Sequence, residues 1–255
     1  MIGAWRRFRE SRTLRRRAIP DALWSLTLAR FPFLARRDDD SLAELRRLST
    51  LFLAQKEFTG AQGFDVTDEV AVAIAAQACV PVLRLGLHWY GQFVGIVVHP
   101  DEVRVRREVM DEAGIVHRYT EVLSGEAMEG GPMMLSWRDV QSAGDDAEWA
   151  YNVVSHEFAH VIDMRDGAAD GIPPLPDRRA RAAWLHVLQS EFESFQQRVD
   201  AGEETALDPY GASGHEEFFA VASEGFFVSP RAMQAEHAPL YDLLRGFYRQ
   251  DPAAL

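Results

Sequence analysis

The spacing of apolar residues changes twice along this 255-residue chain. Before about residue 80, apolar residues recur every three or four positions, as they do on one face of a helix. From 91 to 137 they form short runs separated by turn residues, which is typical of strands. After residue 145 the helical spacing returns. This order predicts a mostly helical α+β fold with one small sheet.

Turn and capping residues predict where these elements begin and end. The expected helices are 41–57, 67–79, one that starts near Asp145 and Glu148 and ends at Gly167, and then 178–199, 214–228 and 231–249. The expected strands lie at 93–98, 102–105, 114–119 and 133–137. Ser41 with Glu44, and Ser213 with Glu216, have the spacing of a capping box at two of the helix starts.

Charge is unevenly distributed and limits the possible partners. The net charge is −12, whereas residues 1–47 carry twelve arginines against six acids. An acidic chain is a poor general binder of nucleic acid, which needs clustered Lys and Arg. We interpret Arg15 to Arg17 as a solvated arm, with contact to a membrane or a partner as the alternative. The segment lacks the apolar region of a secretory signal.

Cys79 is the only cysteine, which excludes an internal disulfide and a cysteine-based zinc site. It lies in an apolar run and is predicted to be buried. The sequence contains no run of about 18 apolar residues, so it does not predict a helix that spans a membrane. These observations together favour the cytoplasm as the compartment.

The clearest chemical motif is His156-Glu157-Phe158-Ala159-His160 within an expected helix. Residues four apart share a helix face, so His156 and His160 can each offer a ring nitrogen to one ion. Glu157 is one residue along, placed to take a proton from a water whose pKa the metal has lowered. The alternative is that both histidines are ordinary core residues. Two imidazoles beside an acid are poor core chemistry without a metal, so we favour a metal site.

Catalytic zinc usually has three protein ligands, and a third is expected from a later helix. The candidates are His215, Glu216, Glu217 and Glu224. The expected capping box would occupy Glu216. Glu217 and Glu224 are seven residues apart and share a helix face, and spacing favours Glu217 as ligand with Glu224 in a supporting role. Asp163, one turn after His160, is a candidate hydrogen-bond partner for His160 or another site group; the alternative is that it faces water.

These residues resemble the Mlc titration factor A family of zinc peptidases. The similarity extends over most of the chain, through segments 53–58, 63–64, 81–89, 135–141, 156–167 and 217–227. It implies a zincin-like fold, one zinc ion on His156, His160 and Glu217, and Glu157 as general base. It also implies aminopeptidase-like activity and contact with a transcriptional repressor. The spacing from Tyr210 to Glu217 is similar to that in the anthrax lethal factor catalytic domain, which makes Tyr210 a candidate catalytic residue.

The resemblance and the motif together lead to a domain assignment and two functional hypotheses. Residues 1–90 are expected to form a helical region with the basic arm, and 91–255 the catalytic region, packed as one compact unit. The first hypothesis is a peptidase in which Glu157 activates a zinc-bound water against a peptide or protein substrate. The second is a regulatory protein that sequesters a repressor and holds zinc mainly as a structural ion.

Overall fold

The computed structural model describes the chain except for residues 1, 111–115, 124, 128–130 and 145–149. The helices are α1 (Ile2–Arg16), α2 (Asp21–Arg30), α3 (Pro32–Ala35), α4 (Asp39–Leu53), α5 (Asp68–Cys79), α6 (Trp137–Ser142), α7 (Val153–Asp163), α8 (Arg178–Asp200), α9 (His215–Val228), α10 (Pro230–Glu236) and α11 (Ala238–Tyr248). Four short 3-10 helices are η1 (Leu87–Tyr90), η2 (Met164–Asp166), η3 (Pro209–Ser213) and η4 (Pro252–Ala254). The strands are β1 (Glu57–Gly60), β2 (Gly95–His99), β3 (Val103–Met110), β4 (Val116–Leu123), β5 (Gly125–Ala127) and β6 (Met133–Ser136).

The described strands form one four-stranded sheet and a separate hairpin of β3 and β4. The order in the sheet is β1-β2-β6-β5. β1 and β6 run parallel to β2, whereas β5 runs antiparallel to β6 with Gly125 opposite Leu135. Together with a chain that is 63% helical, this small sheet confirms the mostly helical α+β prediction.

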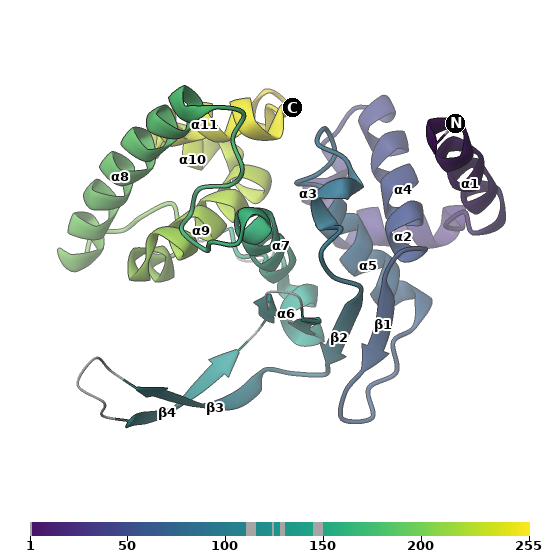
Figure 1. The fold of residues 1–255 in the computed structure, drawn as a ribbon, viewed down its shortest axis with the longest axis horizontal. Coiled ribbons are helices and arrows are strands. Elements are labelled where there is room, and N and C mark those ends of the chain that lie inside the picture. Colours follow the sequence, from purple (N-terminus) through teal and green to yellow (C-terminus); the bar gives the residue numbers. More distant parts are fainter. Residues whose placement is uncertain (1, 111–115, 124, 128–130, 145–149) are drawn as a thin grey trace.

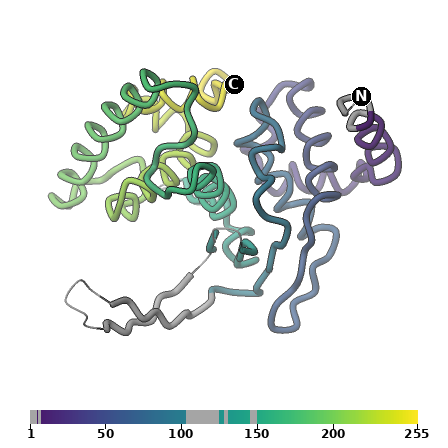
Figure 2. The backbone as a smooth tube through the Cα atoms, viewed as in Figure 1, coloured from purple at the N-terminus to yellow at the C-terminus, as the bar shows by residue number. Residues whose placement is uncertain are grey.

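Helix α7 lies between two groups of helices. Figures 1 and 2 show α1, α2, α4 and α5 on one side of it and α8 to α11 on the other, with the sheet below. One hydrophobic cluster runs through both groups, from Ile19 to Tyr248. The core is therefore continuous across residue 90, the expected boundary between the two regions. None of the helices in the described part of the chain combines the length and apolar character needed to cross a membrane.

An aromatic cluster fixes α7 from behind. The ring of Phe158 lies 5.7 Å from that of Phe52, 4.7 Å from Tyr90 and 5.9 Å from Phe93, measured between centroids. Truncating such a buried Phe to Ala typically costs about 3–5 kcal/mol. Because Phe158 points into the core, the neighbouring histidines of the same helix point to the opposite side.

The first predicted helix is wrong at both ends. Helix α4 spans Asp39–Leu53, and its cap is Asp38, which accepts a hydrogen bond from Ser41 N at 2.7 Å, so Ser41 is not the capping residue. The helix ends early because the following residues pair elsewhere. The buried Lys56 ammonium donates to the carbonyls of Tyr90 and Phe93, and Glu57–Gly60 joins β2 as a parallel strand. By contrast, the helix predicted at 67–79 is confirmed, with Thr67 as its cap.

Three further expectations change. Helix α7 begins at Val153 after the cap Asn152, which accepts from Ser155 N at 2.9 Å; Asp145 and Glu148 lie outside the described residues. The segment 231–249 forms two helices, which separate at His237 because Pro239 has no N–H to continue the first. Arg15 to Arg17 are exposed, as expected of a solvated arm, but Arg15 and Arg16 lie within helix α1.

The capping box predicted at Ser213 and Glu216 is also wrong. Gly214 caps α9 without a side-chain hydrogen bond. The Ser213 hydroxyl instead donates to the Tyr210 carbonyl at 2.7 Å, which closes the short helix η3 in front of α9.

Candidate metal centre

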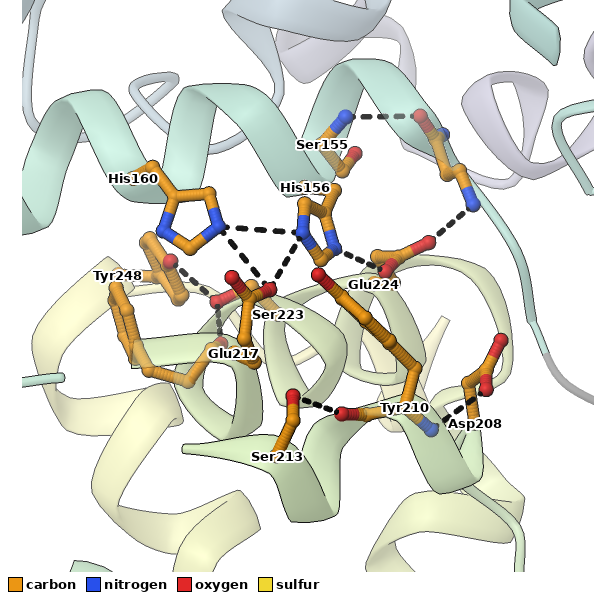
Figure 3. A network of polar contacts seen from close by, with 12 residues as sticks. Ser155, His156, His160, Asp208, Tyr210, Ser213, Glu217, Ser223, Glu224 and Tyr248 are labelled. Atoms are coloured by element: carbon orange, nitrogen blue, oxygen red, sulfur yellow. Dashed lines mark hydrogen bonds and ion pairs between the residues drawn. The ribbon is translucent and has the colours of Figure 1, made fainter. Parts of the chain in front are cut away.

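Helices α7 and α9 pack directly against each other and bring three predicted ligands together (Figure 3). His156 Nε2 lies 3.1 Å from Glu217 Oε2 and 3.2 Å from His160 Nε2. His160 Nε2 is 3.4 Å from Glu217 Oε2. Four tetrahedral donors about 2.0–2.1 Å from an ion would be separated by about 3.3 Å. The three atoms therefore fit three corners around one metal ion.

Hydrogen bonding at the three groups reflects this close approach. Burial alone would raise the pKa of Glu217, but the hydrogen bonds with His156 and His160 hold it far below its ordinary value. Burial opposes protonation of His156, yet the carboxylates of Glu217 and Glu224 raise its pKa well above the usual range. A cation shared by the three groups would satisfy the same electrostatics, because the carboxylates then face positive charge without a proton on the imidazole.

Glu224 supports His156 from the other side. Its Oε1 lies 2.8 Å from His156 Nδ1, and its Oε2 accepts a hydrogen bond from Asn152 N. The side chain is only 4% exposed. A carboxylate on Nδ1 keeps the proton there and leaves Nε2 free to bind a metal. Glu224 therefore contacts a proposed ligand, and Glu217 rather than Glu224 belongs to the group that could hold a metal ion.

Glu157 lies on an adjacent face of α7, against strand β5. Gly125 is so near that a β-carbon there would be 2.6 Å from Oε1 of Glu157. The backbone N–H of Ala127 donates to the same carboxylate. Burial raises the pKa of Glu157, which His156 and His160 partly oppose. A buried carboxylate with a raised pKa beside a metal position is suited to accept a proton.

Tyr210 lies beside His156. It lies in η3, and its ring points toward His156 with the centroids 6.1 Å apart (Figure 3). The side chain is 55% exposed. Asp208 accepts a hydrogen bond from Tyr210 N at 2.9 Å, which fixes the turn that carries it. The Tyr210 ring is thus near the group of His156, His160 and Glu217 that could hold a metal ion.

Asp163, a candidate partner for His160 or another site group, hydrogen-bonds to the backbone of Gly171. It is fully buried, so it does not face water, and its Oδ2 accepts from Gly171 N at 2.8 Å. Gly171 in turn lies against the start of α9, where a β-carbon on it would be 2.5 Å from the His215 carbonyl oxygen. Asp163 therefore connects the end of α7 to the start of the helix that carries Glu217.

Three residues near the metal position were not predicted as site residues: Gly125, Ala127 and Asn152. Asn152 carries a sequence signal, since Asn is a favoured N-cap residue and it immediately precedes the motif helix. The contacts of Gly125 and Ala127 depend on how β5 approaches α7, and a three-residue strand has no periodicity from which to infer that.

A mostly helical α+β fold, with two histidines and a glutamate on packed helices, is the arrangement expected of a metallopeptidase. Comparison with known proteins agrees, and the chain belongs to the glucose-regulated metallo-peptidase M90 family, whose model matches residues 5–249.

Relatives cover nearly the whole chain. An uncharacterized protein of Synechocystis sp. is 36% identical over 97% of this chain and 90% of its own length. Proteins named Mlc titration factor A are 38% identical in Cronobacter sakazakii, over 90% of this chain and 86% of theirs, and 37% identical in Enterobacter sp., over 91% and 88%. The resemblance inferred from the sequence is confirmed.

Proposed function

We propose that this protein is a zinc-dependent peptidase with Glu157 as its general base. The observation that carries the proposal is the triangle of His156 Nε2, His160 Nε2 and Glu217 Oε2, with sides of 3.1 to 3.4 Å. Among the described residues this is the group of His, Cys, Asp and Glu side chains close enough to hold one ion. Two imidazoles and one carboxylate are a usual ligand set for catalytic zinc, and three ligands leave one position open.

Zinc held here would supply a Lewis acid that polarises a carbonyl group and lowers the pKa of water. The protein supplies the remaining functions. Glu157 accepts a proton from the attacking water at its carboxylate, and burial favours the protonated acid that results. It can then deliver that proton to the departing amine. The Tyr210 hydroxyl, on the side of His156, is placed to donate a hydrogen bond to the oxygen on which charge develops.

The strand next to Glu157 supports a peptide as substrate. β5 pairs with β6 on one side, and no second partner of β5 occurs among the described residues. Its other edge runs beside Glu157, to which the Ala127 N–H donates. An extended peptide can hydrogen-bond to such an edge, which would place its backbone along the metal position.

Glu157→Gln tests the proposal directly. The variant should retain zinc, because Glu157 is not a ligand, and should lose hydrolysis of alanine p-nitroanilide by about 10²–10⁴-fold. Zinc content is measured by elemental analysis of both proteins. Turnover by the variant equal to that of the parent would exclude Glu157 as the base. Comparing alanine p-nitroanilide with its N-acetylated form tests the aminopeptidase-like activity, since an aminopeptidase requires the free amine.

We propose, second, that the protein binds a transcriptional repressor in the cytoplasm, as the sequence resemblance implies. Two relatives are named as titration factors of Mlc, which agrees with a binding role. Binding of a repressor does not require hydrolysis. His156→Ala/His160→Ala should therefore abolish zinc binding and activity. If zinc is not structural, the variant should still capture the repressor. Loss of activity and of repressor capture in a folded variant would favour a structural zinc.

A further inference from the structure

The outward face of α1 combines aromatic and cationic side chains. Trp5, Phe8, Arg9, Arg12 and Arg16 follow the spacing i, i+3, i+4, i+7 and i+11, which places them on one side of a helix. All five are exposed. Trp5 is 66% and Phe8 61% exposed, the highest values for large hydrophobic residues in the described part of the chain.

The opposite side of α1 attaches it to the body of the protein. Glu10 lies on that side, and its carboxylate is 3.9 Å from Arg47 of α4. Leu14, also on that side, and Thr13 on its flank are partly buried. Helix α1 packs mainly against α4, and Trp5 and Phe8 stay largely exposed in that packing.

An excess of positive charge lies in this helix and at Arg17, which follows it. Residues 1–17 contain seven arginines and one glutamate, a net charge of +6, which leaves −18 on the rest of a chain whose total is −12. Among the described side chains, Arg9, Arg12 and Arg16 make no ion pair with an acid. The guanidinium of Arg9 lies over the Trp5 ring, 5.1 Å from its centroid.

The position of α1 decides how this face can be used. Figure 1 shows the helix at the outer edge of the molecule, on the far side of α4 from helix α7, which carries the two histidines. The rest of the chain is negatively charged and repels an anionic partner. An anionic partner that contacts the protein on several sides is therefore disfavoured. A flat anionic surface can touch α1 along its length without contacting the rest.

We propose that the outer face of α1 binds the surface of an anionic lipid bilayer. Aromatic side chains enter the boundary between headgroups and acyl chains, and arginines beside them contact phosphate groups. Trp5 and Arg9 border a hollow between α1, α4 and η1, and Phe8 is 61% exposed on the same helix. Arginines beside two exposed rings match an anionic surface with an apolar layer beneath it. The contact would hold the protein at the membrane by one edge and leave α7 and α9 away from it.

Flotation of the full-length protein with vesicles tests this proposal. We expect it to float with phosphatidylcholine vesicles that contain about one third phosphatidylglycerol, but not with phosphatidylcholine alone. Raising NaCl from about 0.05 to about 0.5 M should release most of it, because the arginine contacts are screened. Failure to float with the anionic vesicles at low salt would overturn the proposal.

Matched variants separate the aromatic, charge and non-specific contributions. Trp5→Ala/Phe8→Ala and Arg9→Gln/Arg12→Gln should each lower the bound fraction by about 10-fold. Arg178→Gln/Arg179→Gln removes the same charge from exposed positions at the start of α8 and should float like the parent. Equal loss in the two arginine variants, with no loss in Trp5→Ala/Phe8→Ala, would show only a net-charge effect and contradict the assignment to α1. Binding to soluble polyglutamate without binding to vesicles would assign the face to an acidic protein instead.

Discussion

Gly125 lies so close to Glu157 that a β-carbon on the glycine would come within 2.6 Å of the carboxylate carbon chain and of Oε1. The backbone of β5 therefore sets the position of the proposed general base. The neighbouring Ala127 N–H adds a hydrogen bond to the same carboxylate. A glycine at 125 allows both contacts, since any side chain there would occupy the space of Glu157.

Gly125→Ala should consequently displace Glu157. A shift of about 1 Å in a catalytic group can cost about 100-fold in turnover, and we expect a loss of that order. Zinc content should not change, because neither residue is a ligand. Gly246→Ala in α11 is the control: a β-carbon added at Gly246 would meet no atom within 4 Å, so activity should be that of the parent. Full activity of Gly125→Ala would show that Glu157 tolerates the shift.

Glu217 and Glu224 should differ in how they affect metal affinity. Glu217→Ala removes one of three ligand groups and should weaken zinc binding severely. Glu224→Gln should weaken it by about 10–100-fold, because an amide N–H facing His156 Nδ1 favours the tautomer with the proton on Nε2. A competition titration with a zinc chelator measures both. A larger loss for Glu224→Gln than for Glu217→Ala would reverse the assignment of the ligand.

Tyr210→Phe should lower turnover by about 10²–10³-fold with little change in the Michaelis constant or in zinc content. A hydroxyl that donates to the developing oxyanion acts mainly in the transition state. The substitution keeps the ring beside His156, so the packing of η3 is preserved. If turnover is unchanged, Tyr210 is a structural residue of the turn before α9.

Asp163 should make stability depend on pH. Burial raises its pKa from an ordinary value of 3.8 to about 6. Because the folded protein holds the proton more tightly, the stability contributed by the protonated acid is complete below about pH 4 and is lost as pH rises through about 6. Asp163→Asn cannot ionise and still offers an oxygen to Gly171 N. Its free energy of unfolding should therefore exceed that of the parent increasingly from pH 4 to 7, by about 2–3 kcal/mol at most.

Urea unfolding of both proteins at several pH values, with a chelator present, measures this difference. The chelator removes any contribution from metal binding, which would otherwise change with pH as well. A difference that stays constant across the range would show that Asp163 keeps an ordinary pKa in the folded protein.

Local sequence was enough to predict several elements and the central motif. Thr67 and Cys79 correctly bound α5, because capping and the following proline act within a few residues. The four-residue spacing of His156 and His160 places both rings on one side of α7 whatever surrounds the helix. The seven-residue spacing of Glu217 and Glu224 likewise places both carboxylates on the side of α9 that faces α7. Both could therefore be identified as candidates for the site.

The errors occur where a distant segment competes with local preference. Residues 54–57 have helical character, yet the buried Lys56 and the pairing of β1 with β2 end α4 early. Ser213 fits a cap for α9, but its hydroxyl closes η3 instead. In each case the polar groups of the segment form hydrogen bonds with a neighbouring element instead of within the predicted helix or cap.

The sequence by itself determined the pair of histidines, the glutamate beside them and the family to which the chain belongs. Only the tertiary structure decided that Glu217 meets both histidines, that Glu224 holds His156 Nδ1, and that Asp163 binds Gly171 rather than His160. The same is true of Gly125, whose contact with Glu157 joins a short strand to a helix 32 positions later. Helical spacing is a property of neighbouring residues, whereas the approach of one element to another depends on the packing of the whole core.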